Sequence, residues 1–279
     1  MSQFEEIGSQ YSVLSMSLHG KLECCCYHKA IQPLIRHDTT VIDFACGAGF
    51  YSFRLLDWGA SCVTGIDNAQ AMIDAAEAAL KTEYSHYASR ANFVLGDGRE
   101  PQLFKQPNGS QGFRLATASW FIEHGKDLQE LTSMFRTVSI NLEPDGVFFC
   151  LCLPPVQDFG SIIAKSKDTA AARRESGVET EYTSELEGGI GYNLLVHVYS
   201  QPAGPSSQSA DEFTISGYHL KKSIYEEAAR AGGMRGKLEW RSVDSSQESL
   251  DALGLSHENA SWAKAQLDLV MSFLVVSKT

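Results

Sequence analysis

The sequence lacks long hydrophobic runs and an excess of basic residues. No apolar stretch reaches the ~18 residues that a membrane-spanning helix needs, and the opening residues hold no basic segment followed by an apolar core. The formal net charge is -11, with 23 Lys and Arg against 34 Asp and Glu. An acidic chain without a basic cluster opposes binding to nucleic acid or to anionic membranes. We therefore expect a cytoplasmic protein without a nucleic-acid or membrane partner.

The sequence also lacks the cysteine spacing of a disulfide framework or of a metal site. Its seven cysteines are an odd number; three are adjacent at positions 24–26, and Cys150 and Cys152 alternate within an apolar run. None has histidine or cysteine partners at metal-ligand spacing. We therefore predict structural thiols and no bound metal.

Alternating apolar runs and helical patterns extend from about residue 40 to residue 153. This alternation is typical of successive βα units, which form a parallel sheet. A helix is expected behind Asn68, which is a good N-cap residue, and a second one is expected to end before Pro144. The strands predicted here are Val41–Ala45, Cys62–Asp67, Asn92–Gly96, Leu115–Phe121 and Val147–Leu153.

Residues 154–217 break this rhythm. The segment opens on two prolines, and only 192–199 and 213–218 have the pattern of strands, so we predict a cap insertion. After it, Ser223 and Glu226 have the spacing of a capping box that starts a helix. Strands at 238–243 and 269–277 are expected to close the sheet as an antiparallel pair. The predicted parts are an N-terminal helical segment (1–40), a core (41–153), the cap (154–217) and a closing helix with strands (218–279).

Carboxylates stand at the ends of three successive predicted strands. Asp43 ends the first strand before Gly47-Ala48-Gly49, Asp67 ends the second, and Asp97 follows the third. In open α/β sheets this edge binds ligands. A carboxylate at the first strand would repel the diphosphate of a dinucleotide, whereas it suits the cationic amino and sulfonium groups of S-adenosylmethionine. Asp67 suits ribose hydroxyls, and Asp97 suits an adenine amino group or simply forms a turn. An NAD-dependent oxidoreductase is the weaker alternative, because Ser52 replaces the third glycine of the dinucleotide fingerprint.

These segments resemble motifs I, II and III of the class I S-adenosylmethionine-dependent methyltransferases, and 116–124 and 142–148 resemble motifs IV and V. The resemblance covers about residues 40–153. More narrowly, 44–51, 117–120, Tyr218-His219 and 224–228 are similar to the toxoflavin-biosynthesis branch and to related fungal and bacterial tailoring enzymes. The sequence departs from many members at Ala45, where they have glycine.

This resemblance implies an α/β fold with a Rossmann-like, mostly parallel seven-stranded sheet, an antiparallel last strand and a cap. S-adenosylmethionine would lie over the first four strands, partly under the N-terminal segment, and would leave as S-adenosylhomocysteine. The predicted cofactor-binding residues are Tyr11, Asp43, Ala45, Cys46, Gly47, Gly49, Asp67, Asn68, Met72, Asp97, Gly98, Arg99, Ser119 and Trp120.

Two histidines are candidate catalytic bases. His124 follows the fourth strand and His219 precedes the capped helix, and an imidazole can accept a proton near neutral pH. His124 could instead start the next helix or contact the cofactor. Glu123 is a weaker candidate base, because an exposed carboxylate at a helix start is commoner.

The favoured function is O-methylation of a small secondary metabolite by a monomer or homodimer. N-methylation of a small heterocycle is the next alternative, because catalysis by positioning serves either nucleophile. A third alternative is an S-adenosylmethionine-binding fold with a regulatory or cyclisation role.

Overall fold

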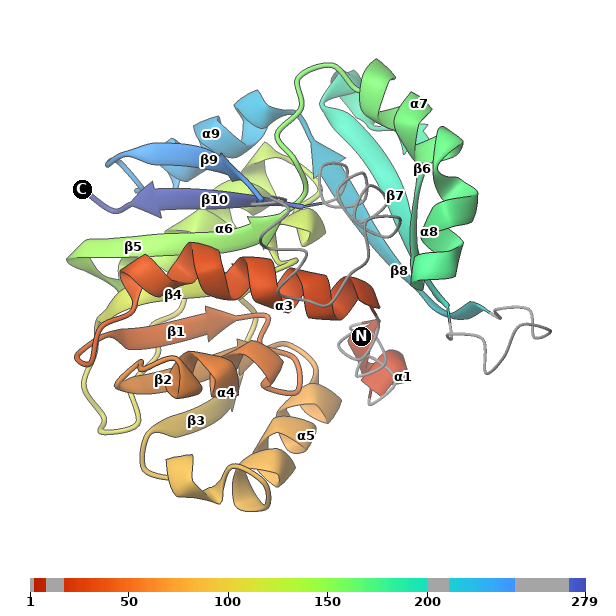
Figure 1. The fold of residues 1–279 in the computed structure, drawn as a ribbon. Helices are drawn as coiled ribbons and strands as arrows, with labels where there is room; N and C mark the ends of the chain where they lie inside the picture. The colour runs from red at the N-terminus through yellow and green to blue at the C-terminus, as the bar shows by residue number, and fades with distance from the viewer. Residues whose placement is uncertain (1–2, 9–17, 200–210, 244–270) are drawn as a thin grey trace.

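Two β-sheets organise the chain (Figure 1). The computed structural model describes residues 3–8, 18–199, 211–243 and 271–279. The larger sheet has seven strands: β1 (Thr40–Phe44), β2 (Cys62–Asp67), β3 (Ala91–Leu95), β4 (Phe113–Ser119), β5 (Leu142–Cys152), β9 (Leu238–Ser242) and β10 (Ser272–Ser277). The smaller sheet, called the cap sheet below, contains β6 (Val178–Glu185), β7 (Gly191–Tyr199) and β8 (Asp211–Leu220).

The strand order of the larger sheet is β3-β2-β1-β4-β5-β10-β9. Strands β1 to β5 pair in parallel, whereas β10 is antiparallel to both β5 and β9. The predicted fold class, with its antiparallel last strand, is therefore confirmed. The order reverses between β1 and β4, and such a reversal is the usual place for a ligand in an open α/β sheet.

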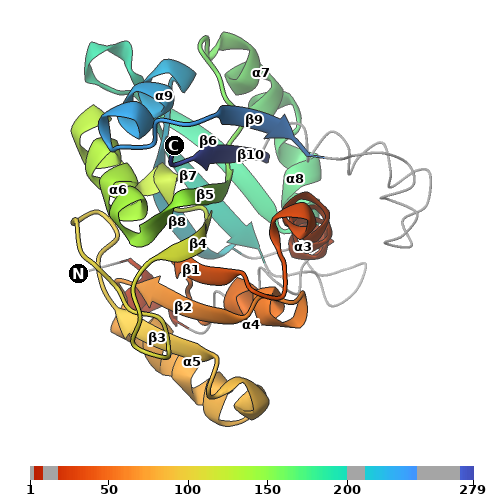
Figure 2. The ribbon, with the colours of Figure 1, turned by 90° about the vertical axis from the view of Figure 1, so that its left-hand side faces the viewer.

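Helices cover both faces of this sheet (Figures 1 and 2). Helices α3 (Leu18–Ile31), α4 (Phe50–Asp57) and α5 (Gln70–Lys81) pack on one face, and α6 (Leu128–Asn141) and α9 (Lys222–Ala231) pack on the other. Because successive side chains of a strand point to opposite faces, Phe149 and Leu151 of β5 join the first layer, and Cys150 and Cys152 join the second. All seven cysteines are free thiols.

The cap sheet is antiparallel, and α7 (Gly160–Asp168) and α8 (Ala170–Ser176) pack against β6. The sequence did not predict α7, α8 or β6. Helices α7 and α8 are short, so their apolar periodicity is weak. The second half of β6 is mostly exposed and polar, so β6 lacks the apolar alternation that predicts a strand. Strand β8 continues to Leu220, so Tyr218 and His219 lie in the cap sheet. Short 3-10 helices lie at Gln32–Leu34 (η2), Ser85–Tyr87 (η3), Ile122–His124 (η4) and Glu187–Gly189 (η5).

Two predicted helix caps are wrong, because partners distant in sequence replace them. The N-cap residue of α5 is Ala69, not Asn68, and no side chain of its own caps it. Instead the carboxylate of Glu5, in α1 (Phe4–Ile7), accepts hydrogen bonds from the backbone of Gln70 and Ala71 at 2.7 and 3.2 Å.

The capping box expected at the start of α9 is likewise not formed. The N-cap residue is Lys221, without a side-chain cap. The Ser223 backbone N–H donates to Gln157, and the Glu226 carboxylate accepts from the Trp240 indole.

Candidate functional site

A cavity of about 850 Å³ lies at the carboxyl ends of β1 to β4. Its wall also includes Gln3 and Phe4 of the N-terminal segment and Ser216 and Tyr218 of β8. Three parts of the chain therefore enclose it. The core residues that line it are Ala45, Ile66, Asp67, Asn68, Leu95, Gly96, Asp97, Gly98, Arg99, Phe121, His124, Lys126 and Glu130.

The turn after β1 has an unusual backbone conformation and leaves open space beside its main chain. Ala45, Gly47 and Gly49 all have positive φ. A Cβ built on Gly49 would lie 2.7 Å from the Phe53 ring, so this glycine is needed for packing. A Cβ built on Gly47 would meet no atom of the described residues within 4 Å. The space beside Gly47 is thus available to a ligand that approaches the main chain closely.

Asp67 lines the cavity and is only 8% exposed. Its carboxylate accepts hydrogen bonds from the backbone N–H groups of Gly47 and Ala69, each at 2.9 Å. Burial raises its pKa, although these hydrogen bonds oppose the rise. Two backbone donors leave further acceptor positions on the carboxylate, so the contact with ribose hydroxyls stays a prediction.

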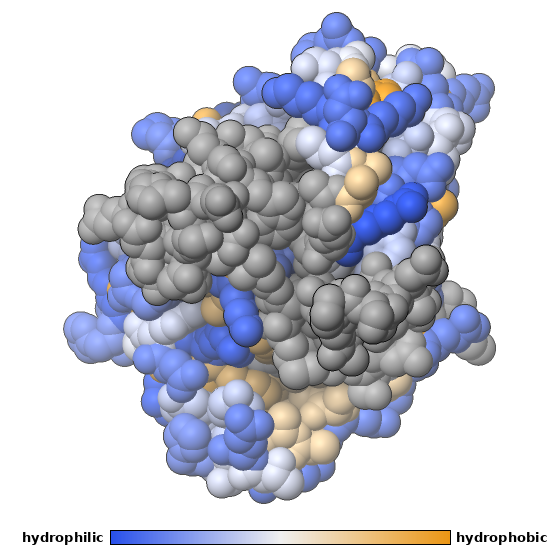
Figure 3. All heavy atoms as spheres, turned by 45° about the vertical axis from the view of Figure 1, so that its right-hand side comes forward, coloured by the Kyte–Doolittle hydropathy of each residue, from blue (hydrophilic) through white to orange (hydrophobic). Residues whose placement is uncertain are grey.

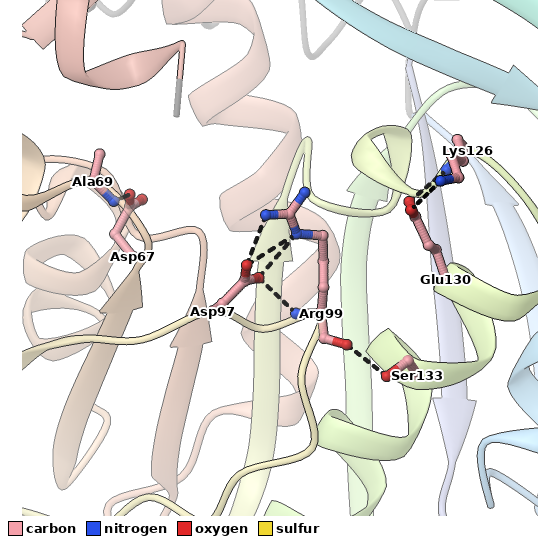
Figure 4. A network of polar contacts seen from close by, with 7 residues as sticks. All are labelled: Asp67, Ala69, Asp97, Arg99, Lys126, Glu130 and Ser133. Atoms are coloured by element: carbon pink, nitrogen blue, oxygen red, sulfur yellow. Dashed lines mark hydrogen bonds and ion pairs between the residues drawn. The ribbon is translucent and has the colours of Figure 1, made fainter. Parts of the chain in front are cut away.

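Asp97 lines the same cavity and is paired with Arg99 (Figure 4). The Arg99 guanidinium donates to both oxygens, with its shortest contact at 2.6 Å, and the Arg99 backbone N–H also donates at 2.9 Å. Desolvation opposes ionisation, but the bonds from Arg99 outweigh it and lower the pKa of Asp97. Asp97 therefore forms a turn and also presents a carboxylate to the cavity.

Asp43 does not line the cavity. It is 2% exposed, and its carboxylate accepts hydrogen bonds from the hydroxyls of Ser52 and Thr117 at 2.6 and 2.8 Å. Burial raises its pKa to about 6. The Asp43 carboxylate thus connects β1 to α4 and β4 inside the core. Of the three predicted carboxylates, only Asp67 and Asp97 line the cavity. Cys46 and Met72 are also buried core residues, and Tyr11 lies outside the described residues.

Ser119 and Trp120 lie where β4 ends. The Ser119 hydroxyl oxygen is buried and has no hydrogen-bond partner within the described part of the chain. Trp120 has φ 58°, and its indole N–H donates to the carboxylate of Glu23 at 2.9 Å. The sequence analysis did not single out Glu23. Its hydrogen-bond partners, Tyr51 and Trp120, lie far away along the chain, so no local sequence pattern indicates it.

His124 and His219 lie in different surroundings. His124 lines the cavity, the Phe4 ring packs edge-on against it at 5.5 Å, and burial, with a smaller effect of Arg99, lowers its pKa to about 4. His219 is fully buried outside the cavity lining. Its Nε2 donates to the Pro154 carbonyl at 2.8 Å, and its Nδ1 lies 2.8 Å from the Tyr182 hydroxyl. Both its ring nitrogens are used within the protein.

Glu123 is buried, contrary to the expectation of an exposed carboxylate. Its side chain accepts a hydrogen bond from the Leu153 backbone at 2.8 Å, and burial raises its pKa to about 7. The described residues contain no cluster that could hold a metal ion and no helix able to cross a membrane. The described surface on the side shown in Figure 3 is mainly hydrophilic.

Comparison with protein families matches residues 41–146 to a methyltransferase domain. No curated protein matches the chain. The fold is shared with solved structures, among them the PH0226 protein of Pyrococcus horikoshii OT3, with 17% identity, TM-score 0.60 and all of both chains covered. An S-adenosylmethionine-dependent methyltransferase of Mesorhizobium loti has 15% identity and TM-score 0.56, covering 92% of this chain and 99% of its own. DesVI of Streptomyces venezuelae has 15% identity and TM-score 0.54, with both chains fully covered.

The match of residues 41–146 to a methyltransferase domain supports the predicted enzyme class and its cofactor, S-adenosylmethionine. The residues present also suit this cofactor. Open space lies beside Gly47, the carboxylates of Asp67 and Asp97 line the cavity, and the Ser119 hydroxyl is buried at the end of β4.

Proposed function

We propose that this chain methylates an oxygen atom of a small secondary metabolite. The observation that supports the proposal is the shared cavity, in which Asp67 and Asp97 of the core lie opposite Ser216 and Tyr218 of the cap sheet. Because the cavity lies between the carboxyl ends of the large-sheet strands and the cap sheet, it has room for an acceptor molecule beside the cofactor. The narrower resemblance to the toxoflavin-biosynthesis branch supports an acceptor of this class.

The core residues would bind and orient the cofactor. Asp67 would accept hydrogen bonds from the ribose hydroxyls, and Asp97 would accept one from the adenine amino group. Because the Asp97 carboxylate is already held by Arg99, its orientation is fixed before the ligand arrives. When bound, S-adenosylmethionine supplies a methyl group activated by its sulfonium.

His124 would accept the proton of the acceptor hydroxyl at its ring nitrogen. It lines the same cavity, and because its pKa is lowered to about 4, the ring is neutral and able to accept a proton at pH 7. The same low pKa limits its strength as a base, so positioning would provide most of the catalysis. His219 is not given this role, because both its nitrogens are hydrogen-bonded inside the protein.

The test is intact mass of products after incubation with S-adenosylmethionine and a panel of matched hydroxyl and amine compounds. We expect a gain of one methylene unit on hydroxyl compounds. Methylation of the amines alone would replace the proposal by N-methylation. No product from any compound, together with tight cofactor binding, would favour a non-catalytic role.

His124→Ala should slow turnover by roughly 100-fold, a typical contribution of a general base, while the dissociation constant of S-adenosylmethionine stays within about threefold. His86→Ala, at an exposed histidine outside the cavity lining, is the matched control. An unchanged rate in His124→Ala would remove the base role from this residue.

A further inference from the structure

Helix α3 carries two polar residues on a side that is turned inward. His19 and Glu23 lie one helical turn apart, and their side chains are only 8% and 13% exposed. In Figure 1 the N-terminal half of α3 lies on the side to which the arrow of β1 points, which is the ligand-binding edge of the sheet.

The Glu23 carboxylate connects both flanks of the turn after β1. One oxygen accepts a hydrogen bond at 2.7 Å from the hydroxyl of Tyr51, in the first turn of α4. The other accepts at 2.9 Å from the indole of Trp120, directly after β4. The His19 ring lies 3.8 Å from this second oxygen. Glu23 is therefore held at the switch point between β1 and β4, beside the segment that contains Gly47.

Two hydroxyl groups next to this carboxylate are buried without a hydrogen-bond partner among the described residues. They belong to Ser119, adjacent to Trp120, and to Tyr27, which stacks on Tyr51 with ring centroids 4.2 Å apart. A buried polar group without a partner costs free energy unless a ligand or water satisfies it. The same place thus holds one carboxylate and two buried hydroxyls, of Tyr27 and Ser119, which interact with each other.

A cationic ligand at Glu23 would restore the full charge of its buried carboxylate. The sequence predicted Asp43 as the carboxylate that faces the cationic groups of the cofactor. In the structure Asp43 is buried and hydrogen-bonded to Ser52 and Thr117. Burial lowers the pKa of His19 to about 4, with a smaller contribution from Arg173, so His19 is neutral at pH 7. Burial also raises the pKa of Glu23 to about 7, against the hydrogen bonds from Tyr51 and Trp120, so without a cationic partner this carboxyl is only partly ionised at pH 7. A carboxylate with two hydrogen bonds retains acceptor positions for a third donor.

We propose that Glu23 binds the α-ammonium group in the amino-acid tail of S-adenosylmethionine. The proposal rests on the cofactor assignment of the proposed function and adds a residue from outside the matched domain. Trp120 and Tyr51 position the carboxylate.

The test compares two ligands that share the adenosine part, in the full chain by titration calorimetry. S-adenosylhomocysteine carries the amino-acid tail, and 5′-methylthioadenosine lacks it. Glu23→Gln should weaken binding of S-adenosylhomocysteine by at least roughly thirtyfold, the lower end for truncating one partner of a buried, hydrogen-bonded charge pair. Binding of 5′-methylthioadenosine should stay within about twofold of wild type.

Asp67→Asn is the contrasting variant, because it should weaken both ligands by the same factor. Glu77→Gln removes the same charge from an exposed pair with Lys81 on α5 and should change neither. Tyr51→Phe removes one donor but keeps the carboxylate, and it reports on folding around α3.

Equal losses for both ligands in Glu23→Gln would mean a purely structural role and would overturn the proposal. So would unchanged binding of S-adenosylhomocysteine, or a loss confined to S-adenosylmethionine, which would place Glu23 at the sulfonium instead. Failure of the wild-type chain to bind either ligand would instead refute the cofactor assignment itself.

Discussion

Two residues other than glycine have positive φ among those that the structure describes, Ala45 at 54° and Trp120 at 58°. They follow β1 and β4, the neighbouring strands at which the strand order reverses. Positive φ is costly for residues with a Cβ, and such strain persists mainly at functional sites. At Trp120 the hydrogen bond to Glu23 helps to hold the backbone. Ala45 has no comparable side-chain interaction.

Ala45→Gly should therefore stabilise the fold modestly. Glycine removes the Cβ clash of the left-handed conformation, worth about 1 kcal/mol, but it also gains entropy in the unfolded chain. We expect a rise of about 0.5 kcal/mol in the free energy of unfolding, measured by urea titration. Ala48→Gly, in the same turn, serves as the control, since Ala48 has no positive φ and gains only the entropic penalty. A loss of stability in Ala45→Gly equal to that of the control would show that φ at this position is not strained.

Single residues also show the limit of the sequence analysis. Asp67 could be placed because its position at the end of a strand fixes which edge it reaches. The burial of Asp43 could not be predicted, since it depends on Thr117, its neighbour across the sheet, and on Ser52. Glu23 was missed because its two donors lie 28 and 97 positions away along the chain.

At the scale of the elements, the junction between β4, β5 and β8 contains the buried carboxyl group of Glu123. Glu123, in η4, accepts one hydrogen bond from the Leu153 backbone, directly after β5. Its other carboxylate oxygen is buried and has no partner in the described residues. A Cβ built on Gly217 of β8 would lie 3.2 Å from the Glu123 carbonyl oxygen, so the cap sheet packs closely here.

Glu123→Gln should change how stability depends on pH. Burial raises the pKa of Glu123 from 4.5 to about 7 in the folded chain. The folded chain therefore holds this proton more tightly than the unfolded chain does. The contribution of Glu123 to stability is fully present below about pH 4.5, and it is lost as pH rises to about 7. The variant should therefore gain roughly 2 to 3 kcal/mol over wild type between pH 5 and pH 8. Chemical denaturation at both pH values measures this difference.

The control for this comparison is Glu77→Gln, whose side chain is 46% exposed. Its stability should follow the wild-type pH profile. Parallel profiles for wild type and Glu123→Gln would mean that Glu123 titrates in the folded chain as it does in the unfolded chain.

The regular elements were predictable to different degrees. Strand β2 has the predicted bounds, because its apolar residues end at Asp67. Strand β4 ends at Ser119, two residues earlier than predicted, because Trp120 adopts positive φ. The starts of α5 and α9 were wrong. Local capping signals at Asn68 and Ser223 were replaced by Glu5 and Gln157, contacts that only tertiary structure creates.

In the whole molecule, α1 links the core, the cavity and the cap sheet. Glu5 caps α5 and Phe4 packs against His124. The Gln3 side chain makes three hydrogen bonds with Ser216 of β8, at 2.9 to 3.1 Å. Since Gln3 and Phe4 line the cavity, this short segment forms part of the cavity wall and joins the two sheets.

Gln3→Ala should therefore act on ligand release more than on folding. These hydrogen bonds are exposed to solvent, so the loss in the free energy of unfolding should be about 1 kcal/mol or less. Dissociation of S-adenosylhomocysteine, followed by stopped-flow fluorescence, should accelerate about three- to tenfold, because interface changes act mainly on the dissociation rate. Gln102→Ala, at an exposed glutamine outside the cavity lining, should leave the rate unchanged. An unaltered rate in Gln3→Ala would mean that the ligand leaves without separating α1 from the cap sheet.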